Sequence, residues 1–281
     1  MGRRTTTLEV DHTEWLTPHM IRVVAGGPDL AAFPDTPYTD RYVKLLFPRD
    51  GVSYPEPFDA DTIRAEMPRE HWPITRTYTL RAFDVARQLI TIDFVYHGDE
   101  GFAGPWAASA RPGDVLRLLG PGGAYAPDPD ADWHLMVGDE SALPAIGAAC
   151  ERVPDGAHVL AVLEVGDAAE HQELDSPGKL DVRWLHRGEG APDQLLEAVR
   201  AAAFPPGDVH AFVHGEAGFV RDVRRHLLAE RGVPRERLSV SGYWRRGRDE
   251  DGWRADKAAE RAAEQRASSV ENEVPVINRA G

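Results

Sequence analysis

The hydrophobic and polar positions follow different patterns in the two halves of the chain. Up to residue 128, short β-rich runs alternate with turns rich in proline and glycine. The clearest run, residues 89–96, alternates in part between apolar and polar side chains, as a half-buried strand does. The other expected strands are residues 20–25, 42–47, 76–82 and 115–119. Several short strands without helical periodicity predict an antiparallel barrel or sandwich.

Beyond residue 128, apolar strand-like runs alternate with helix-length segments. The runs begin near Trp133, His158, Val182, Val209 and Leu238. Helices are expected over residues 141–153, 192–203 and 219–231. Strands that alternate with helices at this spacing predict βαβ units and a parallel sheet.

A turn-rich stretch, residues 127–130, separates the two patterns and is the expected domain boundary. We therefore expect a β-barrel domain over residues 1–128 and an α/β domain over residues 129–247. Residues 248–281 include an Ala/Glu/Arg-rich stretch, which predicts a solvated helix or a frayed tail.

Length and charge narrow the class of protein. The 281 residues exceed one ordinary domain, in agreement with the change of pattern. The formal net charge of −14 argues against general binding to nucleic acids or to anionic membranes. Cys150 is the single cysteine, so an internal disulfide, a cysteinyl iron–sulfur cluster and a structural cysteine-type zinc site are excluded. No apolar segment reaches the ~20 residues that span a bilayer, and we expect a cytoplasmic protein.

Several enzyme motifs are absent. His214 and Glu216 match the H-x-E of zinc deaminases, but the paired cysteines of that motif are missing. The chain also lacks H-E-x-x-H, Walker A, G-x-S-x-G and G-x-G-x-x-G sequences. We therefore expect no metal site and no hydrolase or kinase chemistry.

One stretch of the first half combines a cation, an aromatic ring and a flexible turn. Arg76 and Tyr78 share one face of an expected strand, and Thr77 and Thr79 share the other. Glycines 98, 101 and 104 follow in a turn where backbone amides can approach a pyrophosphate. The stretch suits a ligand with phosphates and a flat ring; the alternative is an ordinary barrel strand followed by a glycine-rich turn.

The order of the sequence blocks resembles the siderophore-interacting protein family, within the ferredoxin-NADP reductase superfamily of flavoenzymes. The blocks that carry the resemblance are residues 76–81, 92–98, 104–107, 111–114, 138–146 and 241–244. It covers about residues 5–253.

The resemblance implies bound FAD. Arg76 would contact its phosphates, Tyr78 would pack on the isoalloxazine, and Thr79 would form a hydrogen bond near flavin N5 and N1. The other FAD contacts that the resemblance implies are Thr77, Asp93, Val95, His97, Ala103, Gly104, Trp106 and Ala107.

In the second half, the resemblance places nicotinamide or the flavin edge at the ends of the expected parallel strands. The residues concerned are Gly138, Asp139, Ser141, Ala142, Gly215 and Glu216. The alternatives are a helix capped by Ser141 and a plain strand-end turn at Gly215. Glu164 and Asp167 lie at the end of the second strand, where acidic groups favour a ribose diol over a 2′-phosphate, and hence NADH over NADPH.

Basic residues are the expected contacts for an anionic ferric chelate. The resemblance assigns this role to Lys44 and to the end of the last strand, where Arg245 and Arg246 follow. The alternative for the arginines is a solvated basic tail. Gly122 stands where some relatives have arginine, so one basic contact is absent.

The function that follows is reduction of a ferric siderophore, with electrons passing from NADH or NADPH through FAD to Fe(III). Electron transfer through FAD requires no catalytic acid–base dyad. The alternatives are a general NAD(P)H:flavin or quinone reductase and a flavin-bearing carrier reduced by a ferredoxin-type partner.

Overall fold

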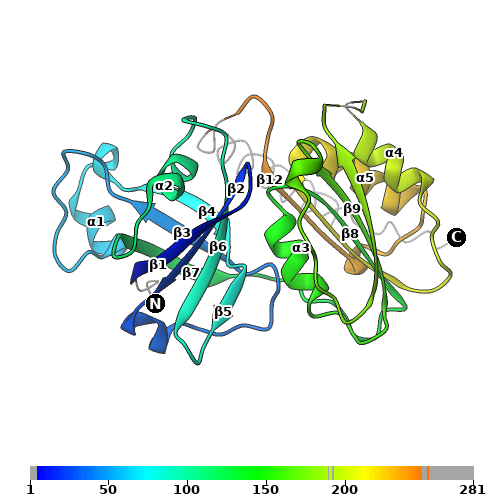
Figure 1. Ribbon diagram of the computed structural model, residues 1–281, viewed down its shortest axis with the longest axis horizontal. Helices are drawn as coiled ribbons and strands as arrows, with labels where there is room; N and C mark the ends of the chain where they lie inside the picture. Colours follow the sequence, from blue (N-terminus) through cyan, green and yellow to red (C-terminus); the bar gives the residue numbers. More distant parts are fainter. Residues whose placement is uncertain (1–4, 189, 192, 249–251, 253–281) are drawn as a thin grey trace, which may run out of the picture. The chain divides into compact units, whose positions relative to one another are not determined.

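The computed structural model describes residues 5–188, 190–191, 193–248 and 252 (Figure 1). The chain up to Tyr243 packs as one compact unit, and the residues from Trp244 onward belong to a second. The first sheet is antiparallel and has seven strands. The second sheet follows it in the chain and has five strands. The predicted fold class, an antiparallel β domain followed by an α/β domain, is confirmed. The boundary near residue 128 stays a prediction.

The seven-stranded sheet has the order β4-β3-β7-β1-β2-β6-β5. Its strands are β1 (Thr6–Thr17), β2 (Met20–Gly26), β3 (Tyr42–Phe47), β4 (Ile74–Thr79), β5 (Ala82–Asp84), β6 (Leu89–Val95) and β7 (Val115–Gly122). In β6, Ile90, Ile92 and Phe94 alternate into the core and are fully buried. The rings of Tyr78 on β4 and Phe94 on β6 lie 4.4 Å apart between centroids, although these strands are not neighbours in the sheet order. The sheet is therefore rolled.

One expectation for this half is wrong, and one strand was missed. Residues 76–82 form not one strand but β4 and β5, because the chain changes partner between them: the Leu80 amide donates to the Arg41 carbonyl, and the Arg81 amide donates to the Thr91 carbonyl. Strand β1 was not predicted, since its polar residues hide the alternation of buried Thr6, Leu8 and Val10. The short helices are α1 (Ala60–Glu66), α2 (Ala103–Ser109), η1 (Pro28–Ala32) and η2 (Arg69–His71).

The five-stranded sheet has the order β10-β9-β8-β11-β12. Its strands are β8 (Trp133–Asp139), β9 (His158–Val165), β10 (Lys179–His186), β11 (Val209–Glu216) and β12 (Leu238–Trp244), and β10, β9, β8 and β11 run parallel. Its helices are α3 (Leu143–Cys150), α4 (Gln194–Ala201), α5 (Ala217–Ala229), η3 (Ala168–Glu170) and η4 (Arg235–Arg237). All five predicted strands and all three predicted helices are present.

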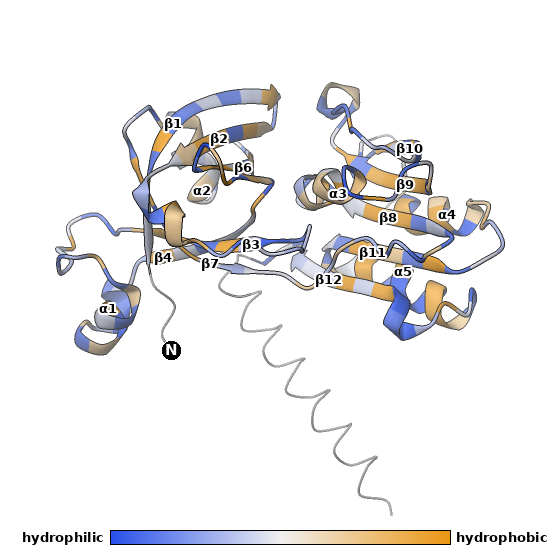
Figure 2. Cartoon of the chain, turned by 90° about the horizontal axis from the view of Figure 1, so that it is seen from below, coloured by the Kyte–Doolittle hydropathy of each residue, from blue (hydrophilic) through white to orange (hydrophobic). Residues whose placement is uncertain are grey.

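Alternation along β8 divides the core of this half into two layers. Leu135 and Val137 pack with α4 and α5, whereas Met136 packs with α3. Figure 2 shows the hydrophobic colour of β8 and β9, which are covered on both faces. Because β9 and β11 flank β8, the strand order reverses there, and the carboxyl ends of these strands form the edge where open parallel sheets bind ligands.

In the described part of the chain, no helix has the length and apolar character needed to cross a membrane. The predicted tail of residues 248–281 lies outside the described residues, apart from Arg248 and Gly252.

Candidate flavin and nicotinamide site

Strand β4 presents the four residues of the predicted flavin motif. Thr79 is buried, Arg76 and Tyr78 are partly exposed, and Thr77 is exposed. The Tyr78 ring is held by its contact with Phe94. The strand therefore offers a cation, an aromatic face and hydroxyl groups along a short stretch of backbone, a donor set that suits a flavin with its phosphates.

The glycine-rich turn before α2 is where the sequence predicts the pyrophosphate site, and its backbone is open at two glycines. Gly98 and Gly101 adopt φ values of +69° and +81°, and a Cβ at either would meet only open space. Gly104 packs closely, since a Cβ there would lie 3.0 Å from the Val95 carbonyl oxygen. Helix α2, all of it described, begins without a capping side chain or an acidic residue.

The remaining predicted FAD contacts hold this turn against the barrel. Ala103 and Ala107 are buried in the barrel core, and Trp106 packs on Phe47 and Phe94 at centroid distances of 5.4 and 5.7 Å. His97 is exposed at the start of the turn, and Val95 is partly buried.

Asp93 has a structural partner. Its carboxylate accepts two hydrogen bonds from Arg22, at 2.7 and 2.9 Å, and its side chain is almost fully buried. The pair raises the pKa of the Arg22 guanidinium, chiefly through the hydrogen bond with Asp93. Asp93 therefore ties β6 to β2, and its contact with FAD stays a prediction.

Asp139 joins the ends of β8 and β11. One carboxylate oxygen accepts from the Ser141 amide at 3.0 Å and from the Ser141 hydroxyl at 2.5 Å, and the other accepts from the Glu216 amide at 2.8 Å. The alternative interpretation, a helix capped by Ser141, does not hold: α3 begins at Leu143 with Ala142 in the cap position, and the Ser141 hydroxyl donates to Asp139. Gly138 is required for close packing, since a Cβ there would lie 2.7 Å from the Ile146 side chain.

Gly215 and Glu216 form a strand-end turn. Gly215 has φ of +137°, and a Cβ there would lie 2.8 Å from the Asp139 carboxylate. The Glu216 carboxylate accepts from the amides of Gly218 and Phe219, at 2.6 and 3.2 Å, and so caps α5. The structure thus brings Asp139, Ser141, Gly215 and Glu216 together at one edge of the sheet.

Glu164, one of the two acidic residues that predict a preference for NADH, is paired, and that preference stays a prediction. Its carboxylate accepts from Arg187 Nε at 3.0 Å and from Gln194 Nε2 at 3.0 Å. Arg187 also donates to both carboxylate oxygens of Glu140. Glu140 was missed because it lies 47 residues before Arg187. Asp167 is exposed and caps η3 through the Ala169 amide at 2.7 Å.

Lys44 lies in β3, partly exposed, opposite Thr77 of β4 in the register. This register places the predicted chelate contact beside the predicted flavin strand. Arg245 and Arg246 directly follow β12 and belong to the second unit of the chain. Their approach to Lys44 stays a prediction.

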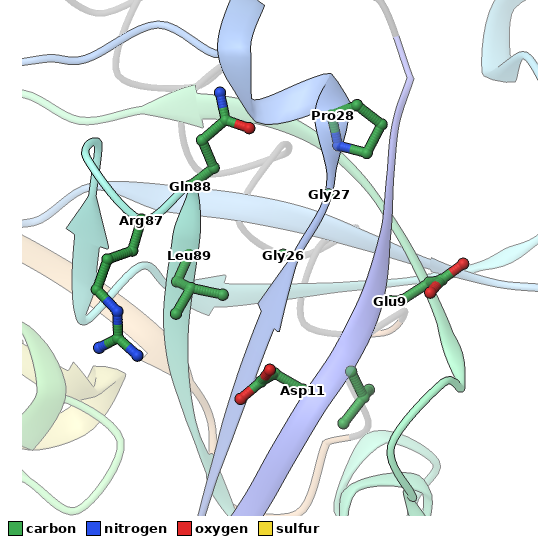
Figure 3. Close-up of a pocket in the computed structure, with 9 residues that line it drawn as sticks. Glu9, Asp11, Gly26, Gly27, Pro28, Arg87, Gln88 and Leu89 are labelled. Carbon is green, nitrogen blue, oxygen red and sulfur yellow. The ribbon is translucent and has the colours of Figure 1, made fainter.

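A hollow of about 460 Å³ lies elsewhere on the barrel, between the end of β2, the strand β1 and the turn before β6 (Figure 3). It is lined by Glu9, Val10, Asp11, Gly26, Gly27, Pro28, Arg87, Gln88 and Leu89. This described set includes no aromatic ring, and it has two carboxylates but one cation. The hollow therefore does not suit a flavin or an anionic chelate.

Comparison with known proteins yields two adjoining family matches. The model of the siderophore-interacting FAD-binding domain matches residues 9–125, and the model of the siderophore-interacting protein matches residues 131–247.

Named relatives span nearly the same length. The ferric vibriobactin reductase ViuB of Vibrio cholerae is 32% identical, over 89% of this chain and 93% of its own. The NADPH-dependent ferric-chelate reductase of Escherichia coli is 31% identical, over 84% and 91%. The crystal structure of a siderophore utilization protein from T. fusca superposes with a TM-score of 0.75 at 42% identity, covering 87% of this chain and 94% of that one.

Proposed function

The chain belongs to the siderophore-interacting protein family, and we propose that it is an FAD-dependent ferric-siderophore reductase that draws its electrons from NAD(P)H. The observation that carries the proposal is the match of both family models over residues 9–125 and 131–247 to a chain with the flavin motif on β4. We propose that the functional division of the chain follows residues 1–128, 129–247 and 248–281.

Bound FAD would allow a donor that gives up two electrons as a hydride to reduce Fe(III) one electron at a time. The residues of this chain supply binding and orientation. We assign Arg76 and the turn of residues 97–104 to the FAD phosphates, and Tyr78 and Thr79 to its ring system. Reduction releases iron because hard oxygen ligands hold Fe(III) more firmly than Fe(II).

The carboxyl edge of the parallel sheet supplies the place for nicotinamide. The carboxylates of Asp139 and Glu216 accept hydrogen bonds from backbone amides. They therefore stabilise the turns at the carboxyl edge of the sheet. Gly138 and Gly215 allow the strand ends and helices to approach closely. These residues therefore act by position rather than by acid–base chemistry.

The chelate is the substrate and is anionic in the chemistry that we propose. Lys44, Arg245 and Arg246 would provide local positive charge on a chain with a net charge of −14. We place the reaction in the cytoplasm, because its reducing conditions suit a chain whose single cysteine is a free, buried thiol.

The two alternatives predict different electron donors and acceptors. A general flavin or quinone reductase would reduce quinones at least as fast as ferric chelates, and a carrier would require reduced ferredoxin. The deciding experiment measures steady-state reduction with NADH, NADPH and reduced ferredoxin, each with a ferric catecholate, a ferric hydroxamate and a quinone. Purified protein should be yellow; protein that takes up no FAD would overturn the proposal.

A further inference from the structure

A hydrogen-bonded chain of side chains leads away from the predicted flavin strand. His214, near the end of β11, has Nδ1 3.0 Å from the Tyr243 hydroxyl and Nε2 3.0 Å from the Ser239 hydroxyl. The Tyr243 side chain also lies beside Thr79, whose side chain acts on the pKa of the Tyr243 phenol as a hydrogen-bond partner and lowers it. Thr79, Tyr243, His214 and Ser239 therefore form one continuous chain, here called the hydroxyl–imidazole chain.

The two ends of this chain lie in different surroundings. Thr79 and His214 are buried, with 7% and 3% of their surfaces exposed. Ser239, at the far end, is partly exposed. The chain therefore connects a buried position, next to the site assigned to the flavin ring, with the surface.

The imidazole is fixed in orientation. Its ring stacks on Phe212 at a centroid distance of 3.6 Å and an angle of 15°, and it meets Tyr243 edge-on at 86°. Its two nitrogens are thereby aimed at two hydroxyl groups. A neutral imidazole has one donor and one acceptor nitrogen, so the chain can run in either direction.

Tyr243 contributes a neutral hydroxyl. Burial is the main cause of the raised pKa of its phenol, and the nearby carboxylate of Asp40 raises it further, against a smaller opposing effect of Thr79. The phenol therefore remains protonated at physiological pH. It can accept a hydrogen bond on one side while it donates one on the other.

We propose that Tyr243 and His214 are positioning residues that orient the Thr79 hydroxyl toward the flavin edge and conduct the proton that the reaction releases. The proposal rests on the proposed function. Oxidation of NAD(P)H by two ferric chelates gives NAD(P)⁺, two ferrous chelates and a proton. That proton arrives with the hydride, and with FAD bound the Thr79 oxygen would accept it from the flavin edge.

The remaining proton transfers along the hydroxyl–imidazole chain deliver one proton to the solvent. The proton of Thr79 passes to the Tyr243 oxygen, the proton of Tyr243 to His214 Nδ1, the proton on Nε2 to Ser239, and the proton of Ser239 to water. Rotation of the hydroxyls and tautomer exchange of the imidazole then restore the starting direction. Each group ends the cycle with the protons it began with.

The test uses the full-length protein loaded with FAD. The flavin is photoreduced without oxygen, mixed with ferric 2,3-dihydroxybenzoate, and followed by absorbance in H₂O and in D₂O. Tyr243→Phe, which keeps the ring, should retain FAD, shift the visible band of the bound flavin, slow reoxidation by about 100-fold and raise the solvent isotope effect. His214→Leu should do the same.

His214→Gln separates the two parts of the proposal. An amide keeps a donor and an acceptor but does not exchange tautomers as imidazole does, so this variant should restore the flavin band without restoring the rate. Tyr125→Phe is the matched control, because it removes another buried phenol hydroxyl, one that contacts the Met136 sulfur at 3.9 Å. It should behave as the parent does.

Parent-like rates, isotope effects and absorbance in Tyr243→Phe and His214→Leu would overturn the proposal. If His214→Leu does not fold, Tyr243→Phe and Ser239→Ala carry the same test. A parent protein that takes up no FAD, or whose reduced flavin does not react with the ferric chelate, would instead refute the proposed function.

Discussion

The guanidinium of Arg187 binds both carboxylate oxygens of Glu140, at 2.9 and 2.6 Å. Its Nε also donates to Glu164, so one cation compensates acidic residues that follow β8 and end β9. The hydrogen bonds with Glu140 are the main cause of the raised pKa of Arg187. The charge at this edge of the sheet is therefore less negative than the sequence suggests, and it depends on how firmly Arg187 is held.

Glu140→Gln should increase the use of NADPH relative to NADH. The substitution frees Arg187 from its bidentate partner, and a charge-assisted hydrogen bond to a 2′-phosphate would then become available, worth about 1.5 to 3 kcal/mol. We expect the ratio of NADPH to NADH rates to rise by about tenfold or more. Anaerobic bleaching of the flavin in a stopped-flow instrument measures both rates.

Arg183→Gln provides the control for this experiment, since Arg183 lies on the same β10 strand and pairs at 3.6 Å with Asp181. Its substitution should leave the ratio unchanged. An unchanged ratio in Glu140→Gln as well would remove Arg187 from the nicotinamide site.

Tyr78→Ala should weaken FAD binding. The substitution removes an aromatic face that we assign to the flavin ring, worth about 0.5 to 1.5 kcal/mol, or up to about tenfold in Kd. Because Tyr78 also packs on Phe94, its loss should lower the melting temperature too. Tyr78→Phe keeps the ring and should retain both properties. Titration of the apoprotein with FAD measures the Kd; equal values for parent and Tyr78→Ala would contradict the assignment.

The elements that the sequence predicted best are those whose signal is local. Residues 42–47 and the run from Trp133 carry enough apolar or alternating residues to identify β3 and β8 directly. Strand β1 was missed because its burial alternates only over its first half, and the split at Leu80 depends on partners 39 residues before it and on Thr91 after it. Local pattern does not encode such changes of partner.

The sequence proposed site residues only where they lie close together in the chain, as at residues 76–79 and 98–104, and their roles stay predictions. Side-chain partners that meet across the fold were missed. Glu140 follows β8 and Arg187 follows β10, and the two meet from segments 47 residues apart; His214 meets a tyrosine 29 residues later. The sequence marked His214 only through a chance metal motif, whereas its chemistry depends on two hydroxyl partners that folding supplies.

His134 should make the protein sensitive to mild acid. Its side chain is fully buried in β8, and within the described part of the chain neither ring nitrogen has a hydrogen-bond partner. Burial, with a smaller effect of the neighbouring His210, lowers its pKa from 6.5 to about 4. Between these values the unfolded chain binds a proton that the folded chain does not. The free energy of unfolding should therefore fall as the pH is lowered from 6.5 to about 4, by about 3 kcal/mol from this group.

His134→Leu removes the group that causes this loss. The free energy of unfolding of the variant should decrease less over the same pH range. Its stability at pH 7 should stay close to that of the parent, because no hydrogen bond of the described residues is broken. Urea denaturation at pH 7, 6, 5 and 4.5 measures the difference. His158→Gln, at an exposed histidine, is the control. Parallel curves for parent and His134→Leu would show that other groups cause the acid sensitivity.

Lys44→Ala and Arg246→Ala should each weaken the ferric chelate without changing the FAD content. Lys44 lies opposite Thr77, beside the strand assigned to the flavin. With a net charge of −14, the chain as a whole repels an anionic chelate, so the site that accepts one needs local positive charge. An exposed contact contributes about 0.2 to 1 kcal/mol, and a partly desolvated one about 1.5 to 3 kcal/mol. The partial burial of Lys44 favours the larger range.

The salt dependence of chelate binding shows whether the effect of these substitutions is electrostatic. A Coulombic contribution at an accessible site shrinks as the ionic strength rises from about 0.01 to 0.15 M, where the screening length falls from about 30 to about 8 Å. Titration of flavin fluorescence with ferric catecholate and hydroxamate chelates at these two salt concentrations measures it. Lys179→Ala removes an exposed lysine from β10 and controls for the change in net charge. If Lys44→Ala and Arg246→Ala bind every chelate as Lys179→Ala does, these cations belong to a solvated surface and the chelate binds elsewhere.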